Sequence, residues 1–399
     1  MIEARQPHTR TSPLKAGIIG IGKMGISHLA LARAHPDLDV VAACDSQGFM
    51  LSAVTANTGL VGYKSVEKML DNEQLDAIFI ATPTASHYDL GVLAINRGLN
   101  VFIEKPLTLS YDQSADLARR SSDAGVAGQV GYHNRFIGTF QEAARLVREG
   151  AIGQVHHVSG QAFGAVVTQR SGGGRTWRSV KSEGGGCLHD YACHVIDLMN
   201  FVAGRPSEVT AAQLSSIYST QVEDAVHALL RYPSGATGSL ETNWSDSSYR
   251  KMTTTITIYG SEGKIFADRQ ECRLYLRDGV SFETFSPGWT VRYITDLQAP
   301  VDFYLRGEEY SAQIDAFARA SRQRDTTAEN SFASAADTDW VVSQILAAQD
   351  RPPTAGSSAM LSAADQRVSG ARWRQASGAA VDAIHRLRRY IRTLSERRP

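Results

Sequence analysis

Cysteine is scarce in this sequence. Four of the 399 residues are cysteine, and no CxxC motif occurs. So sparse a set excludes a disulfide-stapled framework, and the missing CxxC removes the most recognisable zinc and redox motifs. We therefore expect reduced, buried thiols in a cytoplasmic protein. The four thiols belong to Cys44, Cys187, Cys193 and Cys272.

Long apolar runs and an excess of charge are also absent. No run approaches the roughly 20 apolar residues that span a bilayer, and the N-terminal MIEARQPHTRTSP lacks the apolar centre of a secretion signal. Lys plus Arg balances Asp plus Glu, 41 against 41, so no net charge draws the chain to nucleic acid or membrane. We expect a cytoplasmic protein that binds neither nucleic acid nor a membrane.

The length and patterning of the chain predict two domains between terminal tails. Residues 1–14 are expected to form a disordered tail. From 15 to 132, short apolar runs alternate with helical periods, which is typical of a Rossmann-type α/β domain built on a doubly wound parallel sheet. The expected strands are AGIIGIG, DVVAACD, DAIFIAT, NVFIEK and VAGQVGY, and the expected helices cover 24–35, 65–72, 85–97 and 110–124.

Residues 133–349 have the pattern of an α+β domain with a large, mostly antiparallel open sheet. A strand-like run covers 154–164, and further runs separated by turn residues recur from 208 to 269. Helices are expected at 139–149, 188–202, 308–322 and 331–349.

Residues 350–399 begin with the linker-like RPPTAGSSAM and continue as a basic segment able to form an amphipathic helix. Two interpretations stay open for this extension. It is a solvated tail, or it is a helix that binds a partner or stabilises an oligomer.

The motif GIGKMG at 20–25 ends a predicted strand and opens a predicted helix, as a dinucleotide-binding loop requires. Gly20 permits a tight turn, Gly22 lets the backbone approach a pyrophosphate, and Gly25 lets the helix pack on the strand. Asp45 ends the second strand, where a carboxylate accepts hydrogen bonds from ribose hydroxyls. The two residues after it are not basic, which favours NAD over NADP. The alternative is a structural glycine turn with a surface aspartate.

The motif EKP at 104–106 ends another predicted strand. The carboxyl ends of such strands face the ligand crevice, so Lys105 is expected to point toward cofactor and substrate. There its ammonium can stabilise negative charge that develops on a reacting oxygen. Pro106 is expected to fix the backbone at this point. A cis peptide bond between Lys105 and Pro106 is one way to do so. A lysine that only forms a surface salt bridge is the alternative.

The stretch EGGGCLHDYACHVIDLMN at 183–200 places Asp190, His194 and Asp197 on one face of a predicted helix. A histidine one turn from a carboxylate suits general acid–base chemistry, and the glycines in front would let a ligand approach. A zinc site, a cysteine redox pair and a capped helix with a buried histidine are the alternatives. Zinc is disfavoured because its candidate ligands do not share one helical face; they are Cys187, His189, Cys193 and His194. We therefore expect no metal.

Taken in order, these motifs resemble the Gfo/Idh/MocA oxidoreductase family. The likeness rests on GIGKMG with Asp45, TPTASH at 82–87, EKP at 104–106 and the GGGxxxDxxxHxID pattern from 184 to 197. It covers residues 15 to 349 and implies that the domain at 133–349 binds substrate and makes oligomer contacts. The resemblance implies that Lys105, Asp190 and His194 are catalytic. His194 would exchange the hydroxyl proton, Asp190 would orient His194, and Lys105 would polarise the reacting oxygen.

The resemblance also implies a cofactor site for NAD, or NADP, along the Rossmann loops. Residues near the nicotinamide end include Glu104 and the segment GYHNRF at 131–136. The implied cofactor-binding residues are Gly20, Ile21, Gly22, Lys23, Met24, Gly25, Asp45, Thr82, Pro83, His87, Glu104, Lys105, Asn134 and Arg135.

Two further pieces, 244–268 and 302–317, resemble family members of surface-polysaccharide and nucleotide-sugar metabolism. They direct the expected substrate toward a small sugar-type molecule held by aromatic stacking and donor groups. The candidate residues are Trp177, Arg178, Trp244, Tyr249 and Arg250. The family likeness further implies a homodimer or homotetramer.

The sequence therefore predicts an NAD(P)-dependent oxidoreductase that moves hydride between nicotinamide and a secondary hydroxyl or ketone of a sugar, polyol or nucleotide-sugar. Two alternatives remain. One is a glycosidase-type enzyme of the same family that recycles bound NAD, and the other is a non-catalytic sensor or partner-binding protein that keeps the cofactor site.

Overall fold

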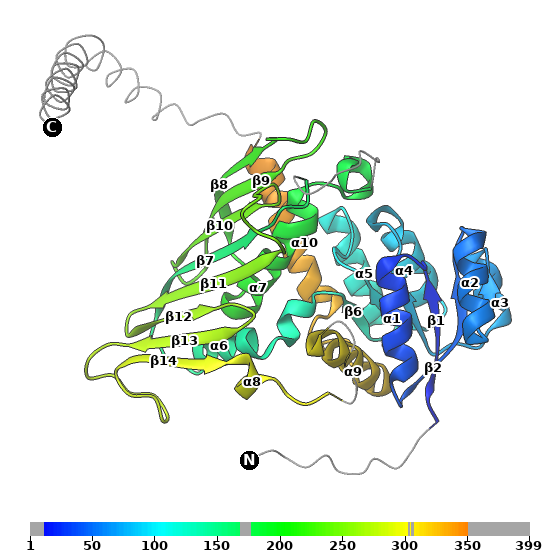
Figure 1. Ribbon diagram of the computed structural model, residues 1–399, viewed down its shortest axis with the longest axis horizontal. Coiled ribbons are helices and arrows are strands. Elements are labelled where there is room, and N and C mark those ends of the chain that lie inside the picture. The colour runs from blue at the N-terminus through cyan, green and yellow to red at the C-terminus, as the bar shows by residue number, and fades with distance from the viewer. Residues whose placement is uncertain (1–11, 168–176, 302–303, 305–306, 350–399) are drawn as a thin grey trace, which may run out of the picture. The chain divides into compact units, whose positions relative to one another are not determined.

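The computed structural model describes residues 12–167, 177–301, 304 and 307–349. Residues 1–11 of the expected tail, residues 168–176 and the extension 350–399 lie outside this part. The residues up to Gln349 form one compact unit, in which two sheets lie on either side of a layer of helices (Figure 1). No helix in the described ranges combines the length and apolarity needed to cross a membrane.

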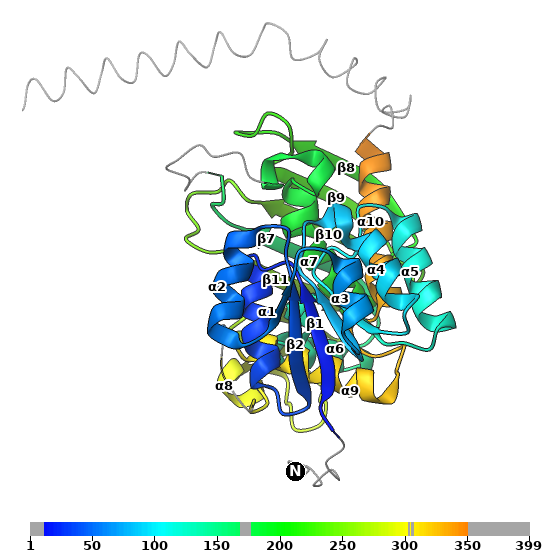
Figure 2. The ribbon, with the colours of Figure 1, turned by 90° about the vertical axis from the view of Figure 1, so that its right-hand side faces the viewer.

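The first sheet has six parallel strands in the order β3-β2-β1-β4-β5-β6, the doubly wound arrangement of a Rossmann fold. The apolar runs AIFI and NVFI are buried at every position because helices cover both faces (Figure 2). Its strands are β1 (Leu14–Ile19), β2 (Leu38–Cys44), β3 (Val61–Tyr63), β4 (Ala77–Ile80), β5 (Asn100–Ile103) and β6 (Gly128–Val130).

The helices of this part are divided between the two faces of the sheet. One face packs against α1 and α2, and the other against α3, α4 and α5. Strand β3 and helix α2 were missed in the sequence, because β3 is short and α2 buries only Leu51. The helices are α1 (Lys23–Ala34), α2 (Gly48–Thr58), α3 (Val66–Asn72), α4 (His87–Ile95) and α5 (Tyr111–Asp123).

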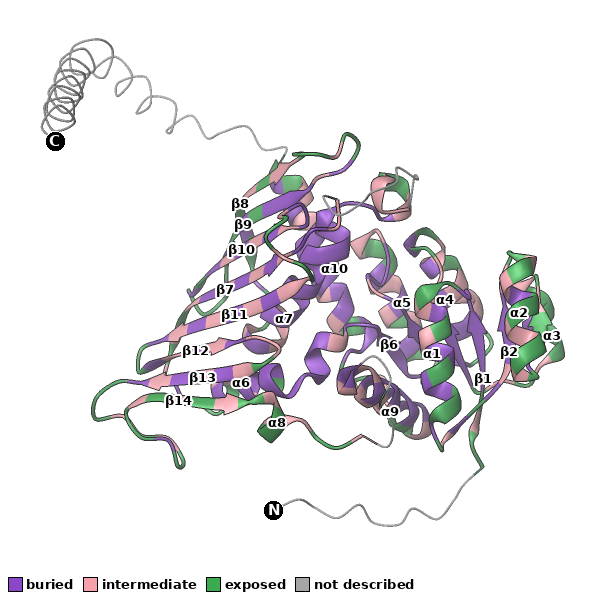
Figure 3. Ribbon diagram, viewed as in Figure 1, coloured by how far each residue is buried: buried purple, intermediate pink, exposed green. Residues whose placement is uncertain are grey.

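The second sheet has eight strands in the order β14-β13-β12-β11-β7-β10-β9-β8. Every pairing is antiparallel except that of β7 with β10. Buried and more exposed residues alternate along its strands, since helices cover one face only (Figure 3). The strands are β7 (Val155–Phe163), β8 (Glu208–Ser215), β9 (Ala225–Arg231), β10 (Thr237–Asn243), β11 (Thr253–Gly260), β12 (Gly263–Ala267), β13 (Glu271–Leu276) and β14 (Gly288–Tyr293).

Together the two sheets confirm the predicted fold class, a Rossmann sheet followed by a large, mostly antiparallel one. The sequence did not predict β13, β14 or the short α8. The remaining helices are α6 (Gly138–Arg148), α7 (Cys193–Ala203), α8 (Ile294–Leu297), α9 (Glu308–Gln323) and α10 (Phe332–Gln349).

Helices α9 and α10 return from the second part of the chain to the first sheet. Phe317 of α9 packs edge-on against Phe79 of β4 and Phe102 of β5, with ring centroids 5.1 and 5.7 Å away. Phe332 of α10 joins the core on the opposite face, and Gln129 of β6 forms a bridge to Ser331. The boundary predicted at 132/133 stays a prediction, but the core of the first sheet includes residues from far beyond it.

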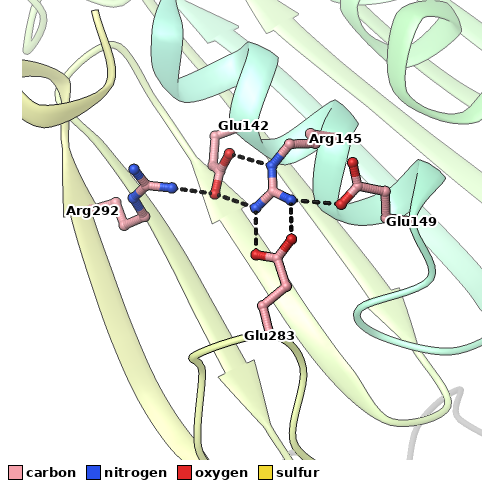
Figure 4. Close-up of polar contacts among 5 residues, drawn as sticks. All are labelled: Glu142, Arg145, Glu149, Glu283 and Arg292. Atoms are coloured by element: carbon pink, nitrogen blue, oxygen red, sulfur yellow. Dashed lines mark hydrogen bonds and ion pairs between the residues drawn. The ribbon is translucent and has the colours of Figure 1, made fainter. Parts of the chain in front are cut away.

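A network of charged side chains holds the loop between β13 and β14 against α6 (Figure 4). Arg145 donates hydrogen bonds to Glu142 and Glu149 on its own helix and to both carboxylate oxygens of Glu283 in the loop. Arg292 of β14 donates to Glu142 at 2.8 Å. Glu142 is buried, and burial alone would raise its pKa, but the two guanidinium groups hold the pKa below its usual value.

We expect Arg145→Met to destabilise the protein by about 1–3 kcal/mol, because Glu142 would remain buried with Arg292 as its main partner. The midpoint of urea unfolding at pH 7 measures the effect. The control is Arg148→Met, an exposed arginine on the same helix, which should change the midpoint little. Equal midpoints for the two variants would show that the network does not support the fold.

Candidate active site

A crevice runs along the carboxyl ends of the strands of the first sheet. It consists of two cavities of about 400 and about 570 Å³ that share the wall formed by Gly22, Lys23 and residues 81–83. Thr82 and Pro83, two of the expected cofactor-binding residues, therefore line both cavities. The larger cavity extends toward Asp45, and the smaller one toward Lys105.

The glycine loop between β1 and α1 leaves room for a ligand at one position. Gly20 has φ +89°, and a Cβ on Gly25 would lie 1.9 Å from the Gly20 carbonyl oxygen, so both positions require glycine. A Cβ on Gly22 would meet no atom within 4 Å. Gly22 instead faces the crevice with Lys23 and Met24, while Ile21 lines the larger cavity. This open backbone at a helix N-terminus fits a dinucleotide pyrophosphate.

Replacing Gly22 by valine should weaken NADH binding at least about tenfold, because the side chain would fill the space left for the pyrophosphate. Thermal unfolding of the ligand-free variant should match the wild type closely, since a Cβ at this position meets no protein atom within 4 Å. Fluorescence titration with NADH measures the affinity. Unchanged affinity with unchanged stability would show that the cofactor does not approach this loop.

Asp45 closes the far end of the larger cavity. Its carboxylate accepts a hydrogen bond from the Ile21 N–H at 2.6 Å and another from the Gln47 N–H at 2.7 Å. Each carboxylate oxygen keeps capacity for a further donor. The side chain is therefore fixed at the end of β2 and can still accept hydrogen bonds from a ribose.

Lys105 lies in the smaller cavity and is fixed by a carboxylate. Its Nζ donates to Asp190 Oδ1 at 2.8 Å and to the Asp190 carbonyl oxygen at 3.1 Å. Burial alone would lower the pKa of Lys105, but Asp190 raises the pKa above its ordinary value. The lysine is therefore a charged group of the crevice, and the peptide bond to Pro106 is cis.

Arg178 completes the partners of Asp190. Its Nε donates to Asp190 Oδ2 at 2.7 Å, and its guanidinium lies over the Trp177 ring at 4.7 Å. The carboxylate is thus held between two cations, which keep its pKa below the ordinary value although burial opposes them. Trp177 and Arg178 both line the cavity with Asp190.

The helix that carries Asp190 begins with a π-helical turn at Leu188–Ala192 and becomes α-helical only at Cys193. No hydrogen bond joins Asp190 to His194 among the described residues. The structure gives no support to a direct contact by which Asp190 would orient His194, because the carboxylate binds Lys105 and Arg178.

His194 lies in the same cavity as Lys105. Its ring packs edge-on against His133 and Tyr132, and its Nδ1 is buried without a hydrogen-bond partner among the described residues. Burial lowers the pKa of His194 well below its ordinary value, and the positive charge of Lys105 lowers it further. The imidazole is therefore neutral near pH 7 and able to accept a proton.

Asp197 follows His194 by three residues within α7, as expected, but it does not line the cavity. It accepts hydrogen bonds from Arg135 Nε at 2.9 Å and Nη2 at 2.6 Å in the protein interior. Arg135 and Asn134 are buried and do not line either cavity of the crevice, so the structure gives no support to their expected cofactor contact. The tight turn at His133–Phe136 instead directs their neighbour His133 into the crevice.

The three glycines before this helix pack against protein rather than facing a ligand. A Cβ on Gly185 would lie 2.4 Å from the Arg178 carbonyl oxygen, and one on Gly186 would lie 2.3 Å from a Glu223 carboxylate oxygen. They do not line the cavity. The predicted approach of a ligand here is wrong, because these positions are filled by the segment that carries Arg178 and by Glu223.

Glu104 and His87 were also expected in the cofactor site, but only Glu104 lines the cavity. Glu104 lines the cavity, and its carboxylate contacts His28 Nε2 at 2.5 Å. His87 is buried outside the cavity wall, where its two ring nitrogens face the carbonyl oxygens of Thr82 and Pro106 at 3.0 Å. His87 therefore holds the two loops of the crevice in place.

The aromatic residues of the cavity are only partly those expected. Trp244 is buried in the core and donates from Nε1 to Asp224, which excludes it from a sugar site. Tyr249 stacks on Phe163, and neither Tyr249 nor Arg250 lines the crevice. Sequence reasoning missed His133 and Tyr310, whose rings stack 4.6 Å apart in the cavity.

Cys187 and Cys193 form no disulfide and have different hydrogen-bond partners. Cys187 Sγ donates to Thr242 and Cys193 Sγ to the His189 carbonyl oxygen. All four cysteines are free and buried. Within the described ranges, no three His, Cys, Asp or Glu side chains are grouped so as to hold a metal ion.

Comparison with known proteins identifies relatives of both parts of the chain. Residues 14–132 match a model of the oxidoreductase family with an NAD-binding Rossmann fold, and residues 140–266 match the GFO/IDH/MocA C-terminal domain. The scyllo-inositol 2-dehydrogenase (NAD(+)) of Bacillus subtilis (strain 168) is 26% identical over 292 residues, which cover 70% of this chain and 82% of that protein. The 2,7-anhydro-N-acetylneuraminate hydratase of Escherichia coli (strain K12) is 25% identical over 274 residues, 67% and 71% of the two chains.

Solved structures share the fold. A levoglucosan dehydrogenase in complex with NADH superimposes with a TM-score of 0.76 at 22% identity, covering 85% of this chain and 97% of the other. The WlbA dehydrogenase of Bordetella pertussis, in complex with NADH and UDP-GlcNAcA, gives 0.69 at 22% identity over 84% and 96%. With family models matched along both of its sheets, this chain belongs to the Gfo/Idh/MocA family of NAD-binding oxidoreductases.

Proposed function

We propose that the protein is an NAD(P)-dependent dehydrogenase that interconverts a secondary hydroxyl and a ketone on a sugar, polyol or nucleotide-sugar. One observation carries the proposal: Lys105 and His194 line a cavity that shares a wall with the glycine-loop cavity. A proton acceptor and a fixed cation thus adjoin the expected cofactor site. The bound nicotinamide supplies the hydride acceptor or donor.

His194 is the proposed proton carrier. As a neutral imidazole it accepts the hydroxyl proton during oxidation and returns it during reduction. Lys105 donates a hydrogen bond to the reacting oxygen and stabilises its negative charge. Asp190 and Arg178 hold the Lys105 ammonium in position. The role of Asp190 thus differs from the one implied by the family resemblance.

The substrate class rests on the lining of the cavity and on the relatives. The rings of Trp177, His133 and Tyr310 supply aromatic surface beside the charged groups, as sugar sites commonly do. The relatives named above include an inositol dehydrogenase and a levoglucosan dehydrogenase. They favour a dehydrogenase over a cofactor-recycling glycosidase or a non-catalytic sensor.

The proposal includes a cytoplasmic homodimer or homotetramer. The uncovered face of the second sheet supports an assembly, because it exposes large apolar side chains. These include Leu229, Trp289, Val291 and Tyr293. Four free, buried thiols support a reducing compartment.

The test is a screen for cofactor reduction with NAD and NADP across sugars, polyols and nucleotide-sugars, read by absorbance of the reduced nicotinamide. We expect turnover with at least one compound that carries a secondary hydroxyl. A parallel calorimetric titration with NADH and NADPH separates a missed substrate from a wrong function. Failure to bind either reduced cofactor would sink the proposal.

A further inference from the structure

Lys64 lies in the larger cavity of the crevice, at the end where the adenosine ribose is expected. In the parallel pairing of β2 and β3, Cys44 lies opposite Tyr63, and the Asp45 N–H donates to the Tyr63 carbonyl oxygen at 3.1 Å. Asp45 and Lys64 therefore leave neighbouring strands at the same edge of the sheet. The sequence did not predict that Asp45 and Lys64 lie close together, because nineteen positions separate them along the chain.

The ammonium of Lys64 is directed toward the turn that follows Asp45. Its Nζ lies 3.4 Å from the place that a Cβ on Gly48 would occupy. Across the described ranges, no carboxylate lies within ion-pairing distance of Lys64. The exposed ammonium of Lys64, which has no acidic partner among the described residues, thus lies in the cavity that Asp45 also lines.

The carboxylate of Asp45 is already bound by protein donors. The N–H groups of Ile21 and Gln47 donate to its two oxygens. These bonds offset part of its negative charge and fix it within the turn. Asp45 therefore repels a phosphate group in this cavity less strongly than a free carboxylate would. Ser46 and Gln47 add polar side chains to the wall of the same cavity.

We propose that Lys64 binds the 2′-phosphate of NADP(H), so that the crevice accepts NADP(H) as well as NAD(H). This proposal rests on the proposed dehydrogenase function. The absence of a basic residue directly after Asp45 is the reason that the sequence favours NAD over NADP. Lys64 supplies the missing charge from the adjacent strand, as a nearby basic residue does in other sites for the phosphorylated cofactor.

The test compares the binding of NADH and NADPH to the full-length protein by fluorescence titration. Wild-type affinities for the two are expected to lie within about tenfold of each other. Lys64→Gln should weaken NADPH about tenfold and NADH less than about twofold, because the loss of one charge-assisted hydrogen bond affects only the phosphate. The matched control is Lys68→Gln, an exposed lysine of α3 outside the cavity, which should change neither affinity.

Fragments isolate the adenosine end. Competition by 2′,5′-ADP should weaken in Lys64→Gln, while competition by 5′-AMP should not. Raising the salt concentration should weaken NADPH more than NADH in the wild type, and this difference should shrink in the variant. NADH binding with an unchanged NADPH-to-NADH ratio in Lys64→Gln would overturn the role of Lys64 alone. Binding of neither cofactor would overturn the proposed function as well.

Discussion

Replacing Lys105 by methionine should lower kcat/KM by about 10³-fold, the scale of losing a charged donor at a developing oxyanion. Asp190 holds this ammonium in the cavity that His194 also lines. Methionine keeps the length of the stem but cannot donate a hydrogen bond. Steady-state kinetics on the substrate found in the screen measure the loss.

The variant must be separated from a folding defect, because Asp190 would keep only Arg178 as a cationic partner. NADH affinity and the thermal unfolding midpoint should therefore be measured on the same preparation. Lys181→Met replaces an exposed lysine outside the cavity and should leave kcat/KM unchanged. A Lys105→Met enzyme that binds NADH and retains kcat would assign the lysine a structural role only.

Replacing Asp339 by asparagine should stabilise the protein at pH 8 and have little effect below pH 4. Asp339 of α10 is buried, and its Oδ2 accepts hydrogen bonds from Ser114 Oγ at 2.6 Å and from the Thr108 N–H at 3.3 Å. Burial raises the pKa of this carboxyl to about 7, and the nearby charge of Asp197 raises it too. The folded protein therefore favours the protonated acid.

The sign of the pH dependence follows from this shift. In the unfolded chain the acid ionises near its ordinary pKa of 3.8, so the unfolded state releases its proton first as the pH rises. The free energy of unfolding then falls between about pH 4 and pH 7. At 1.36 kcal/mol per pH unit, the interval corresponds to about 4 kcal/mol at most. Asparagine carries no charge and removes this loss.

Urea unfolding at pH 4, 6 and 8 measures the effect as a widening difference between variant and wild type. Asp123→Asn is the control, because Asp123 is an exposed carboxylate at the end of α5. That substitution should not reproduce the gain at pH 8. A difference between Asp339→Asn and wild type that stays constant with pH would contradict a raised pKa in the folded state.

Much of the first sheet could be predicted from the sequence. Strands such as AIFI and NVFI are buried on both faces, so their composition alone marks them. The glycine loop was predicted for a similar reason, since Gly20 and Gly25 are required by the local backbone. Helix α2 was not predicted because it buries a single residue, and strand β3 was not predicted because it is only three residues long.

The smaller cavity was harder to predict because its side chains come from separate segments. Lys105 follows the strand NVFI closely, and the EKP motif indicated that its side chain faces the crevice. His133 and Tyr310 stack on each other from positions far apart in the chain, and no local pattern signals such a contact. The pairing of Asp190 with Lys105 rather than His194 joins residues 85 positions apart, and helical spacing does not reveal such a contact.

The return of α9 and α10 to the first sheet affects how the protein must be made. A ribosome delivers β1 to β6 long before Phe317 and Phe332, which complete the two faces of that sheet. Until then the nascent chain carries an apolar surface around Phe79 and Phe102, the kind of surface that chaperones bind. The part of the protein that is synthesised first is therefore among the last to be finished.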